Sequence, residues 1–143
     1  GCRAAASKFP DAIVYLTDVD IRYPMDVFRR IRSHTRSGSA FYAPIVSLEK
    51  RDGTLYGERE DDHQGGGQIG VFARDFIKSG GWQDSKYMNF GRWGGQDSHF
   101  RNVLKTHGLK EQRIPSYDMV SQWHPREHTW YDTGRADKGH MWW

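Results

Sequence analysis

Short hydrophobic runs alternate with polar stretches along the chain, and three of these runs have the residue types of β-strands. Residues 11–17 (DAIVYLT) form an apolar run rich in β-branched and aromatic side chains, which is typical of a buried strand. Residues 40–48 (AFYAPIVSL) predict a second strand, in which Pro44 indicates an edge position or a bulge. Residues 68–72 (QIGVF) predict a third, shorter strand. The charged, glycine-rich stretch 49–67 predicts a long loop between the last two.

Helices are predicted where apolar residues recur at helical spacing. Pro24 suits the first turn of a helix, and Gly38 is expected to end it. Between them, Val27, Phe28 and Ile31 fall on one helical face, which we expect to be buried.

The second half of the chain predicts further helices and two strands. A helical turn is expected over residues 74–79, and a longer helix is expected to open near Asp97 and to end at Gly108. Its inward-facing residues are Phe100, Val103 and Leu104. Two short strands, residues 112–114 and 117–122, are predicted to follow. Because strands alternate with helices, the predicted class is α/β with a mixed sheet.

Composition narrows the classes of protein without selecting one. The 143 residues suffice for one domain or a part of one, and they include 6 Trp, 7 Tyr and 7 Phe. A net charge of +3 is too small to predict a nucleic-acid partner. No run approaches the roughly 18–20 apolar residues of a membrane span. Cys2 is the single cysteine, which excludes an internal disulfide and a cysteine-built metal site, and the start at Gly1 leads us to expect a piece of a longer protein.

Two carboxylates follow the first predicted strand. In α/β sheets, ligands bind outside the carboxyl ends of strands, which is where Asp18 and Asp20 are expected. In an extended chain, side chains alternate, so both would lie on one side with Val19 facing the core. Paired oxygen donors suit Mg²⁺ or Mn²⁺, which commonly bridge to substrate phosphates. A solvated acidic turn is the alternative that these residues leave open.

Two later segments could carry chemistry. In residues 91–98 (GRWGGQDS), two glycines permit a tight turn that delivers Asp97 to a helix start beside Trp93. This arrangement suits a general base next to an aromatic platform for a sugar ring, although a helix cap and a core tryptophan would give the same pattern. His124 follows a predicted strand and could be a metal ligand or a structural histidine. The patterns of zinc proteases, phosphate-binding loops and serine hydrolases are absent.

Taken in order, these motifs resemble the catalytic half of inverting GT-A glycosyltransferases of the chondroitin N-acetylgalactosaminyltransferase and β-1,4-galactosyltransferase superfamily. The resemblance covers about residues 11–128, and the chondroitin branch is closer because of three segments: 18–21 (DVDI), 41–47 (FYAPIVS) and 97–99 (DSH). It implies that residues 1–143 are a fragment of a single catalytic domain with a GT-A fold. The fragment would be the C-terminal half, without the N-terminal nucleotide-binding half.

The resemblance implies a donor side and an acceptor side. Asp20 would bind Mn²⁺, or another divalent cation, that bridges the diphosphate of a UDP-sugar, and His124 would complete the metal site. Asp18 and Gln96 would bind the nucleotide-sugar. Asp97 would be the base that deprotonates the acceptor hydroxyl. The acceptor glycan would lie at Trp93.

Two positions depart from the family pattern. Gln96 stands where the family has Glu, and Ser121 stands where it has a ligand-type residue three positions before the metal histidine. These departures motivate a second hypothesis, a non-catalytic glycosyltransferase-like partner subunit. A metal-dependent phosphoesterase that uses the same acidic pair is a third.

The first hypothesis is a transferase that moves GalNAc, glucuronate or galactose from a UDP-sugar to a glycan hydroxyl with inversion. The resemblance implies a Golgi-lumen type II membrane protein whose anchor lies outside these residues, with no nucleic-acid partner. Assembly with like or unlike subunits is compatible with it. We expect residues 1–143 alone not to turn over substrate, because the uridine-binding half is missing.

Overall fold

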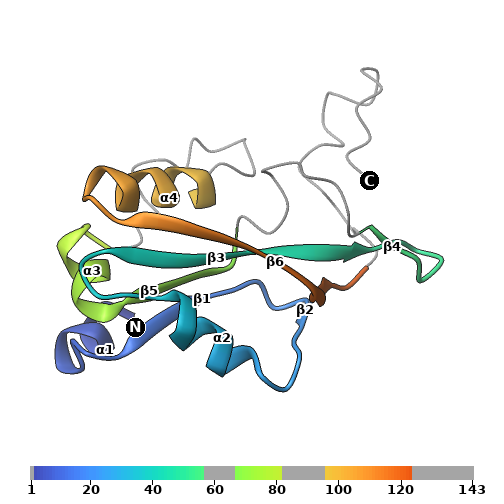
Figure 1. Ribbon diagram of the computed structural model, residues 1–143, viewed down its shortest axis with the longest axis horizontal. Coiled ribbons are helices and arrows are strands. Elements are labelled where there is room, and N and C mark those ends of the chain that lie inside the picture. Colours follow the sequence, from blue (N-terminus) through green and yellow to red (C-terminus); the bar gives the residue numbers. More distant parts are fainter. Residues whose placement is uncertain (1, 57–66, 82–95, 124–143) are drawn as a thin grey trace.

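A computed structural model describes residues 2–56, 67–81 and 96–123, in which helices flank a mixed sheet (Figure 1). The helices of this part are α1 (Cys2–Lys8), α2 (Val27–His34), α3 (Ala73–Lys78) and α4 (Gln96–Thr106). Its strands are β1 (Ile13–Leu16), β2 (Ile21–Arg22), β3 (Ala40–Glu49), β4 (Leu55–Tyr56), β5 (Ile69–Phe72) and β6 (Lys110–Ser121). None of the helices described is long and apolar enough to cross a bilayer.

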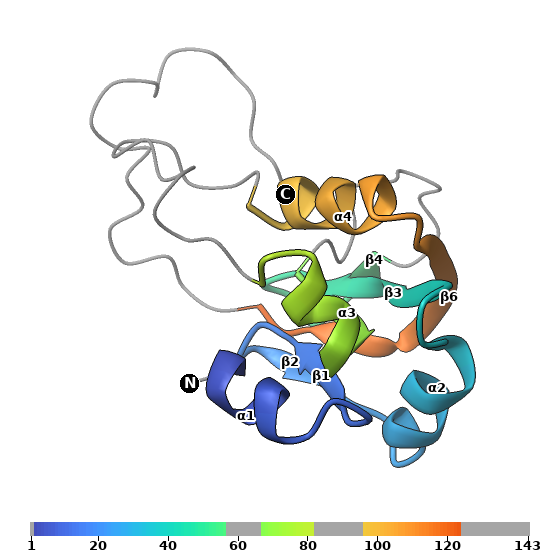
Figure 2. The ribbon, with the colours of Figure 1, turned by 90° about the vertical axis from the view of Figure 1, so that its left-hand side faces the viewer.

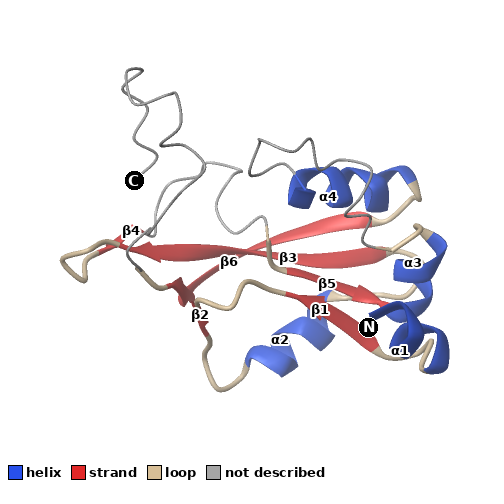
Figure 3. Ribbon diagram, turned by 180° about the vertical axis from the view of Figure 1, so that it is seen from behind, coloured by secondary structure: helices blue, strands red, loops and turns tan. Residues whose placement is uncertain are grey.

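The sheet is built around two long strands that run side by side. Its order is β1-β5-β3-β6-β2, with β4 paired to β3 (Figure 3). The β3–β6 pair is parallel, and the other pairs are antiparallel. The predicted α/β class with a mixed sheet is therefore confirmed.

Strand β3 is buried on both faces, so the sheet needs a layer of helices on each side. Phe41 and Ala43 point into one hydrophobic cluster and Tyr42 into another, as the alternation of side chains along a strand requires. Helix α4 covers one face and α2 the other, while α1 and α3 pack together at one end (Figure 1 and Figure 2). The α4 side of the core consists of Ala6, Phe41, Ala43, Ile69, Val71, Ala73, Phe76, Phe100, Leu104 and Leu109. The α2 side consists of Ile21, Val27, Ile31, Tyr42, Val46 and Met119.

The predicted pair of C-terminal strands is a single strand, β6. It runs parallel to β3 from the pair Ala40–Lys110 onward, and its register shifts between Ile45 and Ser47. This irregularity coincides with the break that the sequence indicated between 114 and 117. Pro44 does not lie in an edge strand, because β3 is central, but it does lie one residue from the irregularity.

Other predictions about single elements need correction. Val27 and Ile31 are buried as expected, whereas Phe28 is 68% exposed and does not belong to the buried face of α2. The helix ends at His34, and Gly38, with a φ of +68°, lies in the turn that leads into β3. The sequence pattern did not indicate α1, β2 or β4; β4 falls within the predicted loop.

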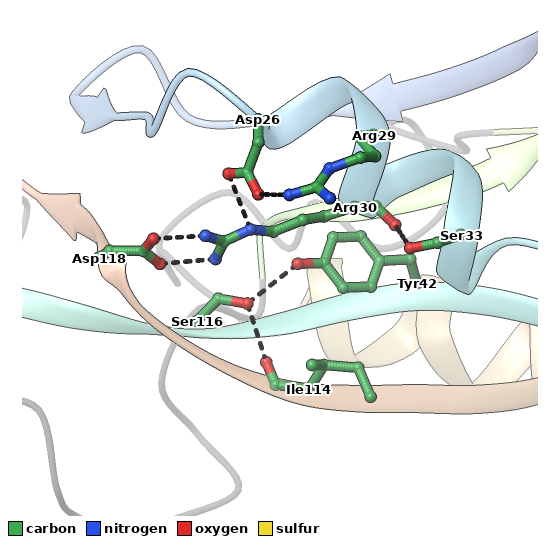
Figure 4. Close-up of polar contacts among 8 residues, drawn as sticks. All are labelled: Asp26, Arg29, Arg30, Ser33, Tyr42, Ile114, Ser116 and Asp118. Atoms are coloured by element: carbon green, nitrogen blue, oxygen red, sulfur yellow. Dashed lines mark hydrogen bonds and ion pairs between the residues drawn. The ribbon is translucent and has the colours of Figure 1, made fainter.

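An arginine on α2 fixes that helix to the sheet. The guanidinium of Arg30 donates two parallel hydrogen bonds to the carboxylate of Asp118 on β6, at 2.6 and 2.7 Å (Figure 4). Its Nε lies 2.9 Å from a carboxylate oxygen of Asp26, just before the helix. Nearby, the buried hydroxyl of Tyr42 is hydrogen-bonded to that of Ser116 at 3.0 Å. Polar contacts therefore join α2 to β6 above an otherwise apolar layer.

We predict that Arg30→Met lowers the free energy of unfolding by about 1 kcal/mol, because it removes a two-bond contact that solvent partly screens. Arg30 also lowers the pKa of the Asp118 carboxyl. The stabilisation is therefore present above the unfolded-state pKa of that carboxyl and should fade as the pH falls through its folded-state pKa. Urea unfolding of the full-length protein at several pH values measures both effects.

Arg29→Met is the matched control. Arg29 contacts the carboxylate of Asp26 but not that of Asp118. Its side chain is 79% exposed, against 29% for Arg30. Its substitution should change stability much less. Equal losses in the two variants would contradict the role given to Arg30.

Candidate functional site

Contacts and charges link four parts of the fold through the two aspartates that follow β1. These parts are the segment 17–20 between β1 and β2, the turn before β5, the first turn of α4 and the end of β6. In Figure 1, segment 17–20 is the blue trace between β1 and β2, and α4 begins above the middle of the sheet. The chemistry-bearing aspartates of the sequence lie in two of these four parts.

Asp18 is held by the residues that precede β5. The side-chain amide of Gln68 donates a hydrogen bond of 2.9 Å to Asp18 Oδ2. Gly67 lies against the same carboxylate, since a Cβ at that position would stand 2.5 Å from Oδ2. The side chain of Asp18 is therefore fixed by contacts 50 residues away in the sequence.

Asp20 is held by the end of β6. The hydroxyl of Ser121 donates to Asp20 Oδ2 at 3.1 Å, and the backbone N–H of Gln122 donates to the Asp20 carbonyl at 2.9 Å. Ser121 thus orients the carboxylate that the resemblance assigns to the metal.

The segment between β1 and β2 is a turn rather than an extended strand. For this reason the predicted alternation fails, and Val19 is fully exposed instead of facing the core. The hydroxyls of Thr17 and Tyr23 contact each other across the segment. Burial raises the pKa of the Tyr23 phenol, and the charges of Asp18 and Asp20 also raise it. Both carboxylates therefore lie within electrostatic range of one tyrosine.

Asp97 lies in the first turn of α4, where it is half-buried. Burial raises the pKa of its carboxyl, and the negative charge of Asp18 raises it further, while Arg101 lowers it. Arg101 lies one helical turn further on, and its Nε donates to Glu111 on β6 at 2.5 Å. The negative charge of Asp18 therefore acts on the carboxyl of Asp97. A carboxylate with a raised proton affinity is suited to accept a proton near neutral pH.

Several predicted site residues lie outside the described part of the chain. Trp93 and His124 do, as does the side chain of Gln96, whose backbone begins α4. In residues 2–56, 67–81 and 96–123, no group of three or more His, Cys, Asp or Glu side chains could hold a metal ion. The carboxylate of Asp20 fits Mn²⁺ by its donor chemistry, because such ions are commonly held by one or two carboxylates together with water and substrate phosphates.

Sequence reasoning missed the partners of the two aspartates. Gln68 and Gly67 gave no signal beyond a polar residue and a glycine before an apolar run. The sequence shows Ser121 only as a departure from the family pattern. The structure shows that its hydroxyl donates a hydrogen bond to the carboxylate of Asp20.

Comparison with known proteins places the chain in a family. A profile of the chondroitin N-acetylgalactosaminyltransferase family matches residues 2–139, and the chain belongs to this family. It is 25% identical over 135 residues to N-acetyl-beta-glucosaminyl-glycoprotein 4-beta-N-acetylgalactosaminyltransferase 1 of Mus musculus, covering 91% of this chain. It is 21% and 22% identical to chondroitin sulfate N-acetylgalactosaminyltransferase 1 of Mus musculus and of Homo sapiens, covering 83% of this chain.

The relatives are much longer proteins. The chain spans 12% of the length of the first relative and 25% of the length of the other two. No solved structure matches the chain.

We predict that Asp97→Asn stabilises the fold at neutral pH. A carboxyl whose folded-state pKa is raised binds its proton more tightly in the folded state, so its ionisation above that pKa costs stability. The gain should disappear in acid, below the unfolded-state pKa, where the carboxyl is protonated in both states. Thermal unfolding at both pH values measures it.

Asp52→Asn serves as the control with the opposite sign. Hydrogen bonds from Thr54 lower the pKa of the Asp52 carboxyl, so removing this charge should give no gain at neutral pH. A lower melting temperature for Asp97→Asn than for Asp52→Asn would contradict the electrostatic account of Asp97.

Proposed function

We propose that the full-length protein transfers N-acetylgalactosamine from a UDP-sugar to a glycan hydroxyl with inversion. The observation that carries this proposal is the Asp18 carboxylate, which Gln68 holds by a hydrogen bond and whose charge raises the pKa of the candidate base Asp97. Of the three donor sugars that the sequence left open, the names of the relatives favour N-acetylgalactosamine over glucuronate and galactose.

The donor side uses carboxylates that the fold already orients. Asp20, held by Ser121, would bind Mn²⁺ together with His124, and Asp18, held by Gln68, would contact the nucleotide-sugar with Gln96. When bound, such an ion supplies positive charge that stabilises the departing diphosphate.

The acceptor side centres on Asp97. The acceptor oxygen forms a bond to the anomeric carbon while the bond from that carbon to the UDP oxygen breaks on the opposite face, so the configuration inverts. Asp97 accepts the hydroxyl proton, and the oxocarbenium-like transition state resembles that of glycoside hydrolysis. Burial raises the pKa of the Asp97 carboxyl, which brings its basicity closer to that needed near neutral pH. Trp93 would supply an apolar surface for the acceptor sugar.

The wider setting of the protein is part of the same proposal. A family that extends glycans is expected in the Golgi lumen, with a type II membrane anchor and any nucleotide-binding half outside residues 1–143. The partners are then the UDP-sugar donor, the acceptor glycan and, in an oligomer, further subunits.

A second candidate is the non-catalytic partner subunit. Ser121 favours it, since its hydroxyl contacts Asp20 at a position where the family pattern has a ligand-type residue. Calorimetry of the full-length protein with UDP and Mn²⁺ separates the two candidates. A dissociation constant below about 1 mM favours the enzyme; this limit corresponds to a binding free energy of about −4 kcal/mol. Undetectable binding favours the partner.

We predict that Asp97→Asn in the full-length protein lowers the rate of N-acetylgalactosamine transfer by about 10²–10⁴-fold, the usual contribution of a general base. UDP affinity should stay within about twofold, because Asp97 serves the acceptor. In the wild type, transfer should fall as the pH drops through the raised pKa of the Asp97 carboxyl. Initial rates with UDP-N-acetylgalactosamine and a glycan acceptor measure both effects.

Asp52→Asn, in the turn between β3 and β4, makes the same chemical change outside the site and should keep the wild-type rate. Wild-type turnover in Asp97→Asn would exclude Asp97 as the base.

A further inference from the structure

Gln68 is a buried polar residue whose side chain is hydrogen-bonded to Asp18 in the candidate site. It is 1% exposed at the entrance to β5, and its amide nitrogen donates to Asp18 Oδ2 at 2.9 Å. Its Oε1 has no hydrogen-bond partner among the residues described. Burying an amide with one unsatisfied oxygen costs stability, whereas an apolar residue would pack there without that cost. The contact with Asp18 is what the described structure gains from a glutamine.

Gly67 leaves room for the Asp18 carboxylate because it has no side chain. A Cβ on Gly67 would lie 2.5 Å from Asp18 Oδ2 and 3.0 Å from both Cγ and Oδ1. All three carboxylate atoms therefore lie against the Gly67 backbone. The φ of Gly67 is outside the left-handed region, so glycine is required here for room rather than for backbone conformation.

We propose that Gln68 and Gly67 are positioning residues that orient the Asp18 carboxylate toward the nucleotide of the donor. The inference rests on the proposed function, which assigns Asp18 to that nucleotide. Gly67 supplies the surface on which the carboxylate lies, and Gln68 fixes its rotation through one oxygen.

Gln68 is uncharged, and this matters for its role in positioning Asp18. A lysine or arginine in place of Gln68 would offset the charge of Asp18, whereas an amide fixes the carboxylate and leaves its charge intact. An intact, oriented carboxylate can accept hydrogen bonds from sugar hydroxyls, as acidic residues do at ribose in dinucleotide sites. The same charge acts on Asp97, so the position of Asp18 influences both sides of the reaction.

The experiment measures the dissociation constant of UDP in the presence of Mn²⁺ by calorimetry, using the full-length protein. Gln68→Met keeps the length of the side chain and removes its N–H donor, and we expect UDP to bind about tenfold more weakly, or about 1.4 kcal/mol. Gly67→Ala displaces the carboxylate by steric contact and should weaken binding to a similar degree. In an Asp18→Ala background, both substitutions should change the dissociation constant by less than about twofold, because they act through Asp18.

Gln112→Met is the matched control, since it makes the same change on β6 at the end remote from Ser121, and it should bind UDP like the wild type. Melting temperatures establish that the variants are folded. If Gln68→Met unfolds below the assay temperature, Gly67→Ala, which changes a turn, decides the question.

Three results would overturn the inference. Wild-type UDP affinity in Gln68→Met and Gly67→Ala, with weak binding in Asp18→Ala, removes the positioning role and leaves the proposed function standing. Losses that persist undiminished in the Asp18→Ala background show a purely structural effect. Wild-type affinity in Asp18→Ala itself removes Asp18 from the donor site, and the proposed role of that residue fails together with the inference.

Discussion

The parallel pairing of β3 with β6 determines where the other described elements can lie. These strands share backbone hydrogen bonds over nearly their whole length, and β3 is buried on both faces, so helices must cover both sides of the sheet. The end of β6 then fixes Ser121, and the pairing of β5 with β3 fixes the turn before β5. Asp18 and Asp20 take their positions from these two places. The site is therefore a product of strand pairing more than of local sequence.

The charge of Asp18 acts on the carboxyl of Asp97, and this repulsion carries a cost that the rest of the fold has to offset. Burial and the charge of Asp18 both raise the pKa of the Asp97 carboxyl. Among the described contacts, an amide donates to the carboxylate of Asp18 and a hydroxyl donates to that of Asp20, and both donors are uncharged. Perturbed groups of this kind concentrate where ligands or protons are handled. Elsewhere, the carboxylates of Asp118 and Glu111 have arginine partners, as structural groups usually do.

The local pattern of apolar and polar residues predicted the main strands and also helices α2 and α4, because each has enough apolar residues to reveal its period. It failed where tertiary contacts decide the outcome. Phe28 has helical spacing but lies outside the contact with the sheet, and β2 is a strand only because the end of β6 pairs with it. The motif residues Asp18, Asp20 and Asp97 could be chosen from the sequence, whereas Gln68 could not. Its role depends on a contact 50 residues away, which no local period reveals.

The connection between β1 and β2 has a geometric consequence. These strands are neighbours in the sequence but lie at opposite ends of the strand order, so four inter-strand spacings, about 19 Å in a flat sheet, separate them. The chain from Leu16 to Ile21 spans at most about 18 Å when fully extended, and here it includes a turn. The sheet must therefore curl until its two edge strands, β1 and β2, approach each other. The short connection through residues 17–20 keeps these edges close together. Asp18 and Asp20 lie in this connection, so their positions depend on the curvature of the sheet, and a change in the length of the connection would alter both.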